Sequence, residues 1–517
     1  MNDWYKDAII YSLHVGTFHD GNGDGVGDFE GLTQKLDYLE RLGVTCLWLL
    51  PFYESPLQDG GYDIADYRRV HPLYGTLDDC QRFIAAAHER GMKVITELVI
   101  NHTSDQHPWF QAARRAPGGS PERDFYVWSH TDDRYRDARL IFHHAETSNW
   151  TWDGEAGAFY WHRFFSHQPD LNFENPNVQE AVADVTRFWL DLGVDGLRLD
   201  AIPHLFEREG TTCDNLPETH AFIKRLRAAV DAGHPDRVLM AEANQPLDII
   251  RSYFGDGDEC QMAFHFPLVH RLFLALARQD TQPIIDVVSA ASNLPDGAQW
   301  ATFLRNHDEL SFSSVVDPDL EVLLQEYAPE PAMRLISGVR RRLSPLLDGH
   351  RARIELAFAL LFSLPGSPVI YYGDEIGMDD DVRLPDRDGL RLPMRWEEVA
   401  QQELPPVLDI LDRGEGGESL LASIKKMIGT RRQHLAFGRG PVSFLDAGNQ
   451  RILALTRRHE DEEILVLANL APTSQTVTID AIDLQMELEG FEWSWFFREV
   501  RTENTKDWDD HRPGRVL

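Results

Sequence analysis

Three carboxylic residues each come at the end of a short apolar run. Asp200 ends GLRLD, Glu242 ends VLMAE and Asp308 ends FLRNHD. Three acids that are brought together can surround one small substrate. Cleavage of a glycosidic bond needs two carboxyls, one that is ionised and attacks the anomeric carbon and one that is protonated and donates to the leaving oxygen. The three residues therefore indicate chemistry at a sugar.

The two roles require different surroundings for the two carboxyls. Arg198 lies two residues before Asp200, and because side chains alternate along a strand, both face the same way. We expect this cation to hold Asp200 ionised. Glu242 has no cation beside it in the sequence, which suits a carboxyl that keeps its proton. The spacing permits this pairing of roles but does not require it.

The elements that must position these acids follow a regular alternation. Eight apolar runs are separated by amphipathic stretches, and the runs are AIIYSLHV, VTCLWLLP, MKVITELVINH, VDGLRLDA, RVLMAEAN, CQMAFHF, QWATFLRNHDE and SPVIYYGDE. Such alternation favours parallel strands joined by crossover helices. Eight units fit an α/β fold of the (β/α)8 TIM barrel type, whose active site lies at the C-terminal ends of the strands. The acids come at those ends.

Two regions interrupt this rhythm. Residues 101–180 are rich in Trp, Tyr, His and Pro and contain no clean strand–helix unit, whereas residues after about 435 alternate apolar and polar positions. We therefore expect a catalytic barrel over 1–100 and 181–430, an inserted domain over 101–180, and a C-terminal antiparallel β domain over 431–517. The aromatic residues of the insertion that could form a lid over the site are Trp150, Trp152, Trp161, Phe164 and Phe165.

The segment DGNGDGVGD has the composition of a cation-binding loop. Its oxygen-bearing residues alternate with glycines and are Asp20, Asn22, Asp24 and Asp28. Hard oxygen ligands on a tightly turning backbone suit calcium. The bidentate Glu that closes an EF-hand loop is not in place, since Glu30 comes too early, and a solvated surface turn is the alternative.

Composition narrows the classes of partner. Lys and Arg number 50 against 84 Asp and Glu, which gives a net charge of −34. Such a surface repels phosphate backbones and anionic lipids, so neither nucleic acid nor a membrane is an expected partner. The N-terminus lacks the basic region of a signal peptide, and no apolar run approaches the about 20 residues of a membrane span. We expect a soluble cytoplasmic protein with a small-molecule substrate, and the sequence leaves its oligomeric state open, a homo-oligomer included.

Several motifs resemble those of a known family. ELVINHTS, QPDLN, GLRLDAI, MAEAN and FLRNHDE resemble, in this order and at fitting intervals, the signature regions of the alpha-amylase superfamily of retaining glycoside hydrolases and transglycosylases. DGGYDIADYR, HRFFSHQPDLN and DEIGMDDD are most similar to its trehalose synthase branch. The resemblance runs from about Trp4 to about Trp396 and continues more weakly into the expected β domain.

The resemblance implies roles for the matching positions. Asp200 matches the nucleophile, Glu242 the general acid/base, and Asp308 the acid that binds sugar hydroxyls and stabilises the transition state. The positions that match residues orienting the nucleophile or hydrogen-bonding the same sugar are Arg198, His102 and His307.

Further positions match a pocket that is closed at one end. Asp59 of DGGY and Arg391 of RLPMRW match an ion pair at the non-reducing end of the glucose, and Tyr62 matches the aromatic platform under its ring. Such a pocket would select a single terminal glucosyl unit and disfavour long chains. By themselves, Asp59 and Tyr62 could equally be a turn acid and a core tyrosine.

The resemblance also bears on cofactors. It supports a structural calcium ion in the loop that contains Asp20, and it implies a second calcium site below the inserted domain, at Asn101, Asp170 and Glu207. Either ion would brace loops rather than take part in the reaction. No organic cofactor is expected.

The activity implied by the resemblance is retaining α-glucosyl transfer on small α-glucosides, and most closely the intramolecular interconversion of maltose and trehalose. The segment after Trp396 is shorter than in that branch, and Arg395 stands where the branch usually has Gln. Hydrolysis by an α-glucosidase, or transfer to another acceptor, therefore stays open. A catalytically inactive sugar-binding scaffold is a remote alternative, because all three acids are present.

Overall fold

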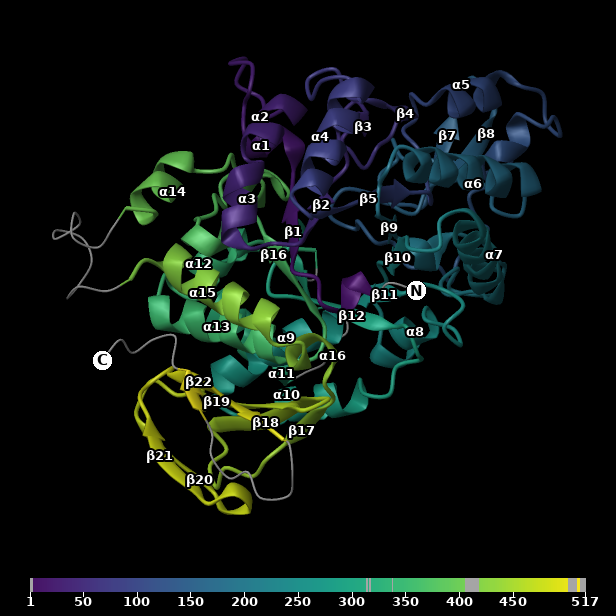
Figure 1. Cartoon of the computed structure of the whole chain (residues 1–517). Helices are drawn as coiled ribbons and strands as arrows, with labels where there is room; N and C mark the ends of the chain where they lie inside the picture. The colour runs from purple at the N-terminus through teal and green to yellow at the C-terminus, as the bar shows by residue number, and fades with distance from the viewer. Residues whose placement is uncertain are drawn as a thin grey trace.

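Eight parallel strands close into a barrel at the centre of the computed structural model (Figure 1). The structure describes residues 3–312, 315, 318–336, 338–404, 418–500 and 509–511. The barrel strands are β1 (Ile10–Leu13), β2 (Cys46–Leu49), β5 (Lys93–Val99), β9 (Gly196–Asp200), β10 (Val238–Ala241), β11 (Met262–Phe264), β12 (Gln299–Phe303) and β16 (Ser367–Tyr371). Strand β1 pairs with both β2 and β16 and so closes the ring. Each strand lies within one of the eight apolar runs, and the predicted barrel is confirmed.

Helices surround the barrel because each buries one apolar face against the strands. In α4 (Leu77–Glu89), Cys80, Phe83 and Ile84 are buried, and Thr76 and Asp79 form a reciprocal capping box that fixes the first turn. The other helices between barrel strands are α2 (Phe29–Gln34), α3 (Leu36–Leu42), α6 (Pro176–Asp191), α7 (Pro217–Gly233), α8 (Leu247–Ser252), α9 (Phe266–Arg278), α10 (Gln282–Ala290) and α13 (Arg351–Ser363), and α15 (Leu420–Gln433) follows the last strand.

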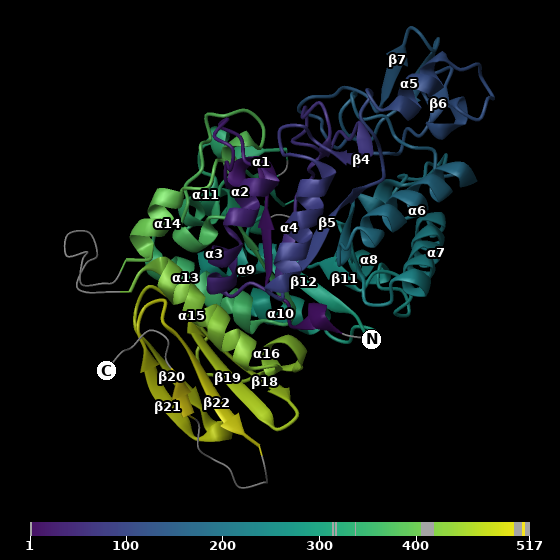
Figure 2. The ribbon, with the colours of Figure 1, turned by 45° about the horizontal axis from the view of Figure 1, so that its top comes forward.

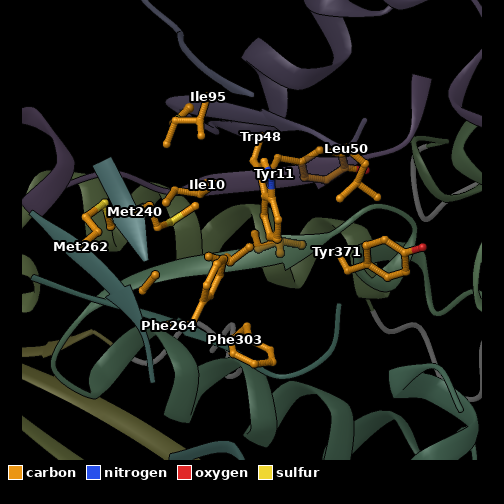
Figure 3. Packing of buried hydrophobic residues seen from close by; sticks show 14 of the residues in the cluster. Ile10, Tyr11, Trp48, Leu50, Ile95, Met240, Met262, Phe264, Phe303 and Tyr371 are labelled. Atoms are coloured by element: carbon orange, nitrogen blue, oxygen red, sulfur yellow. The ribbon is translucent and has the colours of Figure 1, made fainter. Parts of the chain in front are cut away.

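The barrel interior is filled with side chains and is not an open channel. Figure 3 shows Ile10, Met240 and Phe264 gathered between the strands, and all three are almost fully buried. Filling of this kind is typical of a TIM barrel. The register sets Glu97 of β5 directly beside Arg198 of β9, which places charged side chains next to each other inside the barrel.

The insertion after β5 folds around a small core of its own. It contains α5 (Pro108–Arg115) and a three-stranded antiparallel sheet in the order β6 (Trp128–Ser129), β8 (Ala158–Trp161), β7 (Trp150–Asp153). Tyr135, Trp150 and Trp161 are buried together within it. Helix α6 already begins at Pro176, so the barrel resumes slightly before the predicted end of the insertion at residue 180.

A second excursion, which the sequence did not reveal, separates β12 from α13. Its elements are β13 (Leu310–Ser311), α11 (Asp319–Tyr327), β14 (Arg334–Leu335), β15 (Gly338–Val339) and α12 (Leu343–Leu346). Each of these strands is two residues long, which is too short for an alternating pattern to show. The remaining elements around the barrel ends are α1 (Val15–Phe18), β3 (Tyr53–Glu54), β4 (Asp66–Val70) and α14 (Trp396–Gln402).

The C-terminal part is antiparallel β structure with a separate apolar core, and it lies against the barrel on the side away from the insertion (Figure 2). One sheet has the order β17 (Val442–Phe444), β18 (Ile452–His459), β19 (Glu462–Asn469), β22 (Trp493–Glu499), β23 (Asp509–His511), and β20 (Gln475–Ile479) pairs with β21 (Leu484–Leu488). The short helix α16 (Ala436–Arg439) precedes them.

Two buried side chains attach this β structure to the barrel. Arg457 of β18 donates from Nη1 to the Ser363 carbonyl oxygen at 2.7 Å, and Trp495 of β22 donates from Nε1 to the Ser363 hydroxyl at 2.7 Å. Ser363 is the last residue of α13, where a cation is favoured by the helix dipole. The end of α13 is thereby held by residues of the C-terminal sheet.

Short 3-10 helices complete the structure, at Trp4–Lys6, Arg123–Phe125, Ile202–His204, Pro331–Met333, Asp374–Ile376, Asp388–Leu390 and Asp480–Ile482. Among the residues that the structure describes, no helix is both long enough and apolar enough to cross a membrane. The four cysteines are buried and form no disulfide, and Cys46 is a core residue as its apolar surroundings predict.

Candidate active site

The three acids lie at the same end of the barrel and line one cavity. Asp200 is the last residue of β9, Glu242 directly follows β10, and Asp308 lies in the loop after β12. All three line a cavity of about 410 Å³, which is within the range of small-molecule sites. The structure therefore brings together the acids that the strand-end pattern selected.

One guanidinium connects the two acids expected to react. Arg198 Nη1 contacts Asp200 Oδ1, and Arg198 Nη2 lies 3.7 Å from Glu242 Oε2. Arg198 and Asp200 lie on one face of the strand, as alternation along β9 predicts. The expectation that Glu242 lacks a cation is wrong, because strand pairing brings Arg198 next to it although the sequence separates them.

A backbone amide fixes the Glu242 carboxyl. The Ala201 N–H donates to Glu242 Oε2 at 2.8 Å. Ala201 has a φ of 49°, in the left-handed region that is unfavourable for a residue with a Cβ atom. Strained backbone of this kind is common at functional sites, and here it occurs directly between the strand that carries the nucleophile candidate and the loop that follows.

Burial dominates the electrostatics of Asp200. Burial raises the pKa of the Asp200 carboxyl well above its usual range; Arg198 opposes the rise, and the nearby carboxylates Glu242 and Glu97 add to it. Arg198 contacts Asp200 as expected and lowers the pKa of its carboxyl, but the same Nη1 atom also binds Glu97 Oε2 at 2.8 Å. Several carboxyls therefore share the charge of one cation.

The pKa of the Asp308 carboxyl is shifted in the opposite direction from that of Asp200. Burial raises the pKa of its carboxyl, but His307, Arg387 and Arg391 outweigh burial and hold the pKa well below its usual range. His307 Nε2 lies 3.1 Å from Asp308 Oδ2. Asp308 is therefore an anion at neutral pH and can accept hydrogen bonds from sugar hydroxyls.

The ion pair expected between Asp59 and Arg391 is replaced by another. Arg387 Nη2 lies 2.6 Å from Asp59 Oδ1, whereas Arg391 binds Asp308 Oδ1 at 3.2 Å and the His307 carbonyl oxygen at 3.1 Å. The two arginines flank the 3-10 helix Asp388–Leu390, and only Arg387 lines the cavity. Either arginine could have been predicted as the partner of Asp59, because DRDGLR contains both of them, four residues apart.

The predicted sugar-facing residues form one connected group. The Tyr62 hydroxyl lies 2.7 Å from His307 Nε2, and the two rings are stacked at 5.5 Å between centroids. His102 Nε2 lies 3.1 Å from the Tyr62 carbonyl oxygen. Burial lowers the pKa of His102 to about 3 and that of His307 to about 4, so both rings are neutral at pH 7. Tyr62 and His102 line the cavity.

Residues 12–340 match the family model described as alpha amylase, catalytic domain.

The chain belongs to the alpha-amylase family.

Its residues 442–507 match the model described as maltogenic amylase, C-terminal domain, which covers most of the C-terminal β structure. The chain is 51% identical to the "Trehalose synthase/amylase TreS" of Mycolicibacterium smegmatis, over 92% of this chain and 86% of that protein. It is 48% identical to the "Trehalose synthase" of Pimelobacter sp., over 92% of this chain and 89% of that protein.

Two solved structures have the same fold at lower identity. An alpha-amylase from H. orenii is 28% identical, with 91% of both chains covered and a TM-score of 0.74. An alpha-glucosyl transfer enzyme, XgtA, is 27% identical, with 95% of this chain and 99% of that chain covered and a TM-score of 0.75. Both likenesses extend over almost the whole chain, the C-terminal part included.

In this family member the aromatic insertion contributes to the cavity differently from the expectation. Trp150 and Trp161 form the insertion's own core, and Trp152 is 54% exposed on its outside. Phe164 lines the cavity as expected, and so does Phe142, which was not among the expected residues; the Phe142 ring lies 5.4 Å from the Arg387 guanidinium carbon. The lid is therefore made by loop residues next to the sheet and not by the tryptophans of the sheet.

The loop's own backbone N–H groups donate hydrogen bonds to the side chains of Asp20, Asn22, Asp24 and Asp28. Asp20 accepts N–H groups from Asn22, Gly23 and Gly25, and Asp28 caps α2 by accepting the Gly31 N–H at 2.6 Å. Gly23 and Gly25 have φ of 87° and 92°, in the left-handed region where a residue with a side chain would be strained. Within the described ranges, no three His, Cys, Asp or Glu side chains gather closely enough to hold a metal ion.

The second predicted set differs, because it leaves buried oxygen atoms without donors. Asn101 Oδ1 and Asp170 Oδ2 are buried and have no hydrogen-bond partner among the described residues. Burial raises the pKa of Asp170 to about 8, and burial together with Asp170 raises the pKa of Glu207 well above its usual range. Two carboxyls that repel each other, beside a free amide oxygen, have the donor chemistry that suits a hard divalent cation.

Sequence reasoning missed one buried acid of the site. Glu97 of β5 is fully buried and binds Arg198, yet its segment ELVINHTS drew attention only to Asn101 and His102. A signal was available, because a single charged residue in the apolar run MKVITELVI must have a partner inside the protein.

Proposed function

We propose that this chain interconverts maltose and trehalose by retaining α-glucosyl transfer within one active site. The observation that carries the proposal is that Asp200 and Glu242 flank one guanidinium in a cavity closed at one end. The chain that carries this pair is 51% identical to a protein named trehalose synthase/amylase.

The first step separates the two glucose units. Glu242 donates its proton to the bridging oxygen while the ionised Asp200 carboxylate attacks the anomeric carbon. The glycosidic C–O bond breaks, an ester forms between Asp200 and the glucosyl carbon, and the other glucose leaves with the proton. The anion of Asp308 and the neutral ring of His102 provide acceptors and donors for the hydroxyls of the sugar at this position, and His307, which is buried and does not line the cavity, holds Asp308 in place.

The second step joins the units again. The freed glucose turns within the cavity and presents its anomeric hydroxyl to the ester. Glu242, now ionised, takes the proton of that hydroxyl as its oxygen attacks the glucosyl carbon, and the bond to Asp200 breaks. Two inversions leave the α configuration unchanged, so joining the two anomeric carbons produces trehalose and the reverse sequence produces maltose.

The shape of the cavity supports a single terminal glucose as the transferred unit. The Asp59–Arg387 ion pair closes the end of the cavity beside Tyr62, and Gln168 also donates to Asp59 Oδ2 at 2.9 Å. A longer glucan would have to displace these buried groups. Neutral disaccharides also suit a protein of net charge −34, which would repel anionic substrates.

Hydrolysis is the competing outcome, because water in place of the freed glucose completes the same two steps. The segment after Trp396, whose shortness left hydrolysis open, falls mainly in residues 405–417 and lies outside the described residues. Exclusion of water by the cavity walls decides between the outcomes.

Calcium belongs to the proposal as a structural ion. Asn101, Asp170 and Glu207 would hold it between the barrel and the insertion, and the unpartnered oxygens of Asn101 and Asp170 support this site. The oxygens around Asp20 are the alternative site, because a carboxylate that accepts backbone N–H groups keeps lone pairs for an ion. A bound ion would brace the loop that leads from Asn101 to His102.

Product analysis tests the function. Incubation with maltose, and separately with trehalose, should reach the same mixture of the two with little free glucose. Predominant glucose from both substrates would favour hydrolysis, and no product from either would overturn the proposal. Asp200→Asn should abolish both reactions and leave the melting temperature close to that of the wild type, which separates lost chemistry from lost folding.

A further inference from the structure

Glu97 lies below the catalytic acids, inside the barrel. It belongs to β5, its register partner on β9 is Arg198, and the next inward pair toward the cavity is Val99 with Asp200. The Glu97 side chain is completely buried and does not line the cavity. It therefore cannot contact a sugar, and any effect on the reaction must pass through other residues.

Both oxygens of Glu97 are used. Oε2 accepts from Arg198 Nη1 at 2.8 Å, and this is the same nitrogen that contacts Asp200 Oδ1. Oε1 accepts from Trp48 Nε1 at 2.8 Å and from the Tyr62 hydroxyl at 3.2 Å. Because a guanidinium is planar and rigid, fixing Nη1 from below also fixes the direction in which Arg198 meets Asp200.

The contact to Tyr62 extends the connection to the other side of the cavity. The Tyr62 hydroxyl lies 2.7 Å from His307 Nε2, which lies 3.1 Å from Asp308 Oδ2. A continuous series of polar contacts therefore joins two catalytic acids, in the order Asp200, Arg198, Glu97, Tyr62, His307 and Asp308. Within this series, Glu97 links Arg198 to Tyr62.

Glu97 is not needed to neutralise the charge of Arg198. Asp200 and Glu242 already face the same guanidinium, so Glu97 adds a third acid to one cation in a buried place. Like charges in such a place are unfavourable, and a charged residue without a role would be easier to replace by an apolar one. The specific hydrogen bonds of Glu97 to three different elements point to a role in geometry.

We propose that Glu97 is a positioning residue for the glucosyl transfer, which holds Arg198 against the nucleophile Asp200 and, through Tyr62, aligns the sugar platform with Asp308. This inference rests on the proposed function of the site. Glu97 acts before the sugar binds and takes no part in bond making. A displacement of about 1 Å at a reacting group can cost about 100-fold in rate, so support of this kind has a measurable effect.

The charge of Glu97 also provides a readout that a purely structural role lacks. Burial raises the pKa of both Asp200 and Glu97, that of Glu97 to about 7, and the negative charge that Glu97 carries when ionised adds to the rise of the Asp200 pKa. Removal of that charge should therefore lower the pKa of Asp200 and move the acid limb of the activity profile to lower pH. The titratable and charged groups that face Glu97 from the surrounding elements are Arg198, Asp200, Glu242 and Tyr62.

The test compares Glu97→Gln, Glu97→Asp and Glu375→Gln with the wild type. Glu375 is a matched control, because it is equally buried and likewise does not line the cavity, but it accepts from the hydroxyls of Tyr11 and Tyr38 at 2.7 Å each instead of from Arg198. Each variant is assayed with maltose and with α-glucosyl fluoride. Fluoride leaves with little help from an acid, so that substrate reports on the attack by Asp200 and not on proton donation by Glu242.

Glu97→Gln should lower kcat by about 100-fold on both substrates with KM changed much less, and should move the acid limb to lower pH. Glu97→Asp, which keeps the charge on a shorter chain, should recover part of the rate and the wild-type acid limb. Glu375→Gln should lower the melting temperature at most and leave the acid limb in place.

Two results would overturn the inference: full kcat with an unmoved acid limb in Glu97→Gln, or equal losses in Glu97→Gln and Glu375→Gln without any shift in the pH profile. A wild-type protein that releases fluoride but does not interconvert maltose and trehalose would refute the proposed function alone. The comparison of the Glu97 variants on α-glucosyl fluoride would still decide the positioning role.

Discussion

Arg387 Nη2 lies 2.6 Å from Asp59 Oδ1, and Arg387 Nη1 lies 3.0 Å from Asp308 Oδ1. One buried guanidinium thus joins an acid of the loop after β2 to an acid of the loop after β12. Because Arg387 itself comes from the loop after β16, three separate loops depend on it for their relative positions at the closed end of the cavity.

Arg387→Ala should lower kcat/KM for maltose by at least about 100-fold, because it leaves the buried Asp59 carboxylate without its cation and removes one of the two arginines that bind Asp308; an unpaired buried charge costs several kcal/mol. Steady-state kinetics check the value. Arg383→Ala is the control, since Arg383 lies in the same loop but is 87% exposed and pairs only with Asp381, and it should behave as wild type. An Arg387→Ala variant with wild-type kcat/KM would contradict the importance of the pair.

Phe142→Ala should increase the proportion of glucose among the products severalfold. The Phe142 ring packs over Arg387 and lines the cavity, so its removal opens the wall to water, which then competes with the retained glucose. Chromatography of products from maltose measures the proportion. Trp152→Ala removes an aromatic residue on the outside of the same insertion and should leave it unchanged; an equal rise in both variants would speak against a local seal.

Calcium should raise the melting temperature of metal-stripped protein, and Glu207→Gln should abolish that rise. Free calcium at 100 times its dissociation constant stabilises the folded state by about 2.7 kcal/mol. Thermal unfolding with a chelator and with added calcium measures the difference. Asp20→Asn should keep the rise; loss of the rise in Asp20→Asn but not in Glu207→Gln would assign the ion to the glycine-rich loop instead.

The stability that three buried histidines contribute should fall as the pH is lowered from about 6.5 toward 4, against an opposite contribution from buried carboxyls with a raised pKa such as Asp170. Burial lowers the pKa of His14 and His270 to about 4 and that of His265 to about 3, from 6.5. The unfolded chain therefore binds protons in this window while these folded rings do not, and each ring removes about 1.4 kcal/mol of unfolding free energy per pH unit. Urea unfolding at constant ionic strength measures the slope. The same measurement on His270→Gln isolates one ring: a stability difference between the wild type and this variant that stays constant from pH 6.5 to pH 5 would contradict the prediction.

The sequence predicts the barrel well and its loops poorly, for a physical reason. Buried strands such as β5 and β9 are recognisable as short apolar runs, and alternation along β9 correctly puts Arg198 beside Asp200. Both are local properties of the chain. The neighbours of Glu242 and Glu97 depend on which strands pair, and that follows only from the closed barrel.

Loop geometry sets the other limit. Arg387 and Arg391 are equivalent candidates in the sequence, and the 3-10 helix between them decides which one reaches Asp59. The excursion between β12 and α13 was not recognised because its strands are only two residues long. Likewise, the aromatic residues of the insertion are evident, but whether a ring faces the cavity or the insertion's own core depends on the pairing of β7 with β8.

The attachment of Arg457 and Trp495 to Ser363 has a practical consequence for anyone who wishes to engineer this protein. Helix α13 leads directly into β16, and the loop after β16 carries Arg387, so the distant β sheets anchor the segment that ends in the catalytic pocket. Deletion of everything after residue 440 would not yield a minimal enzyme. Exchange of C-terminal parts between relatives requires that the arginine, the tryptophan and the serine be transplanted as one set.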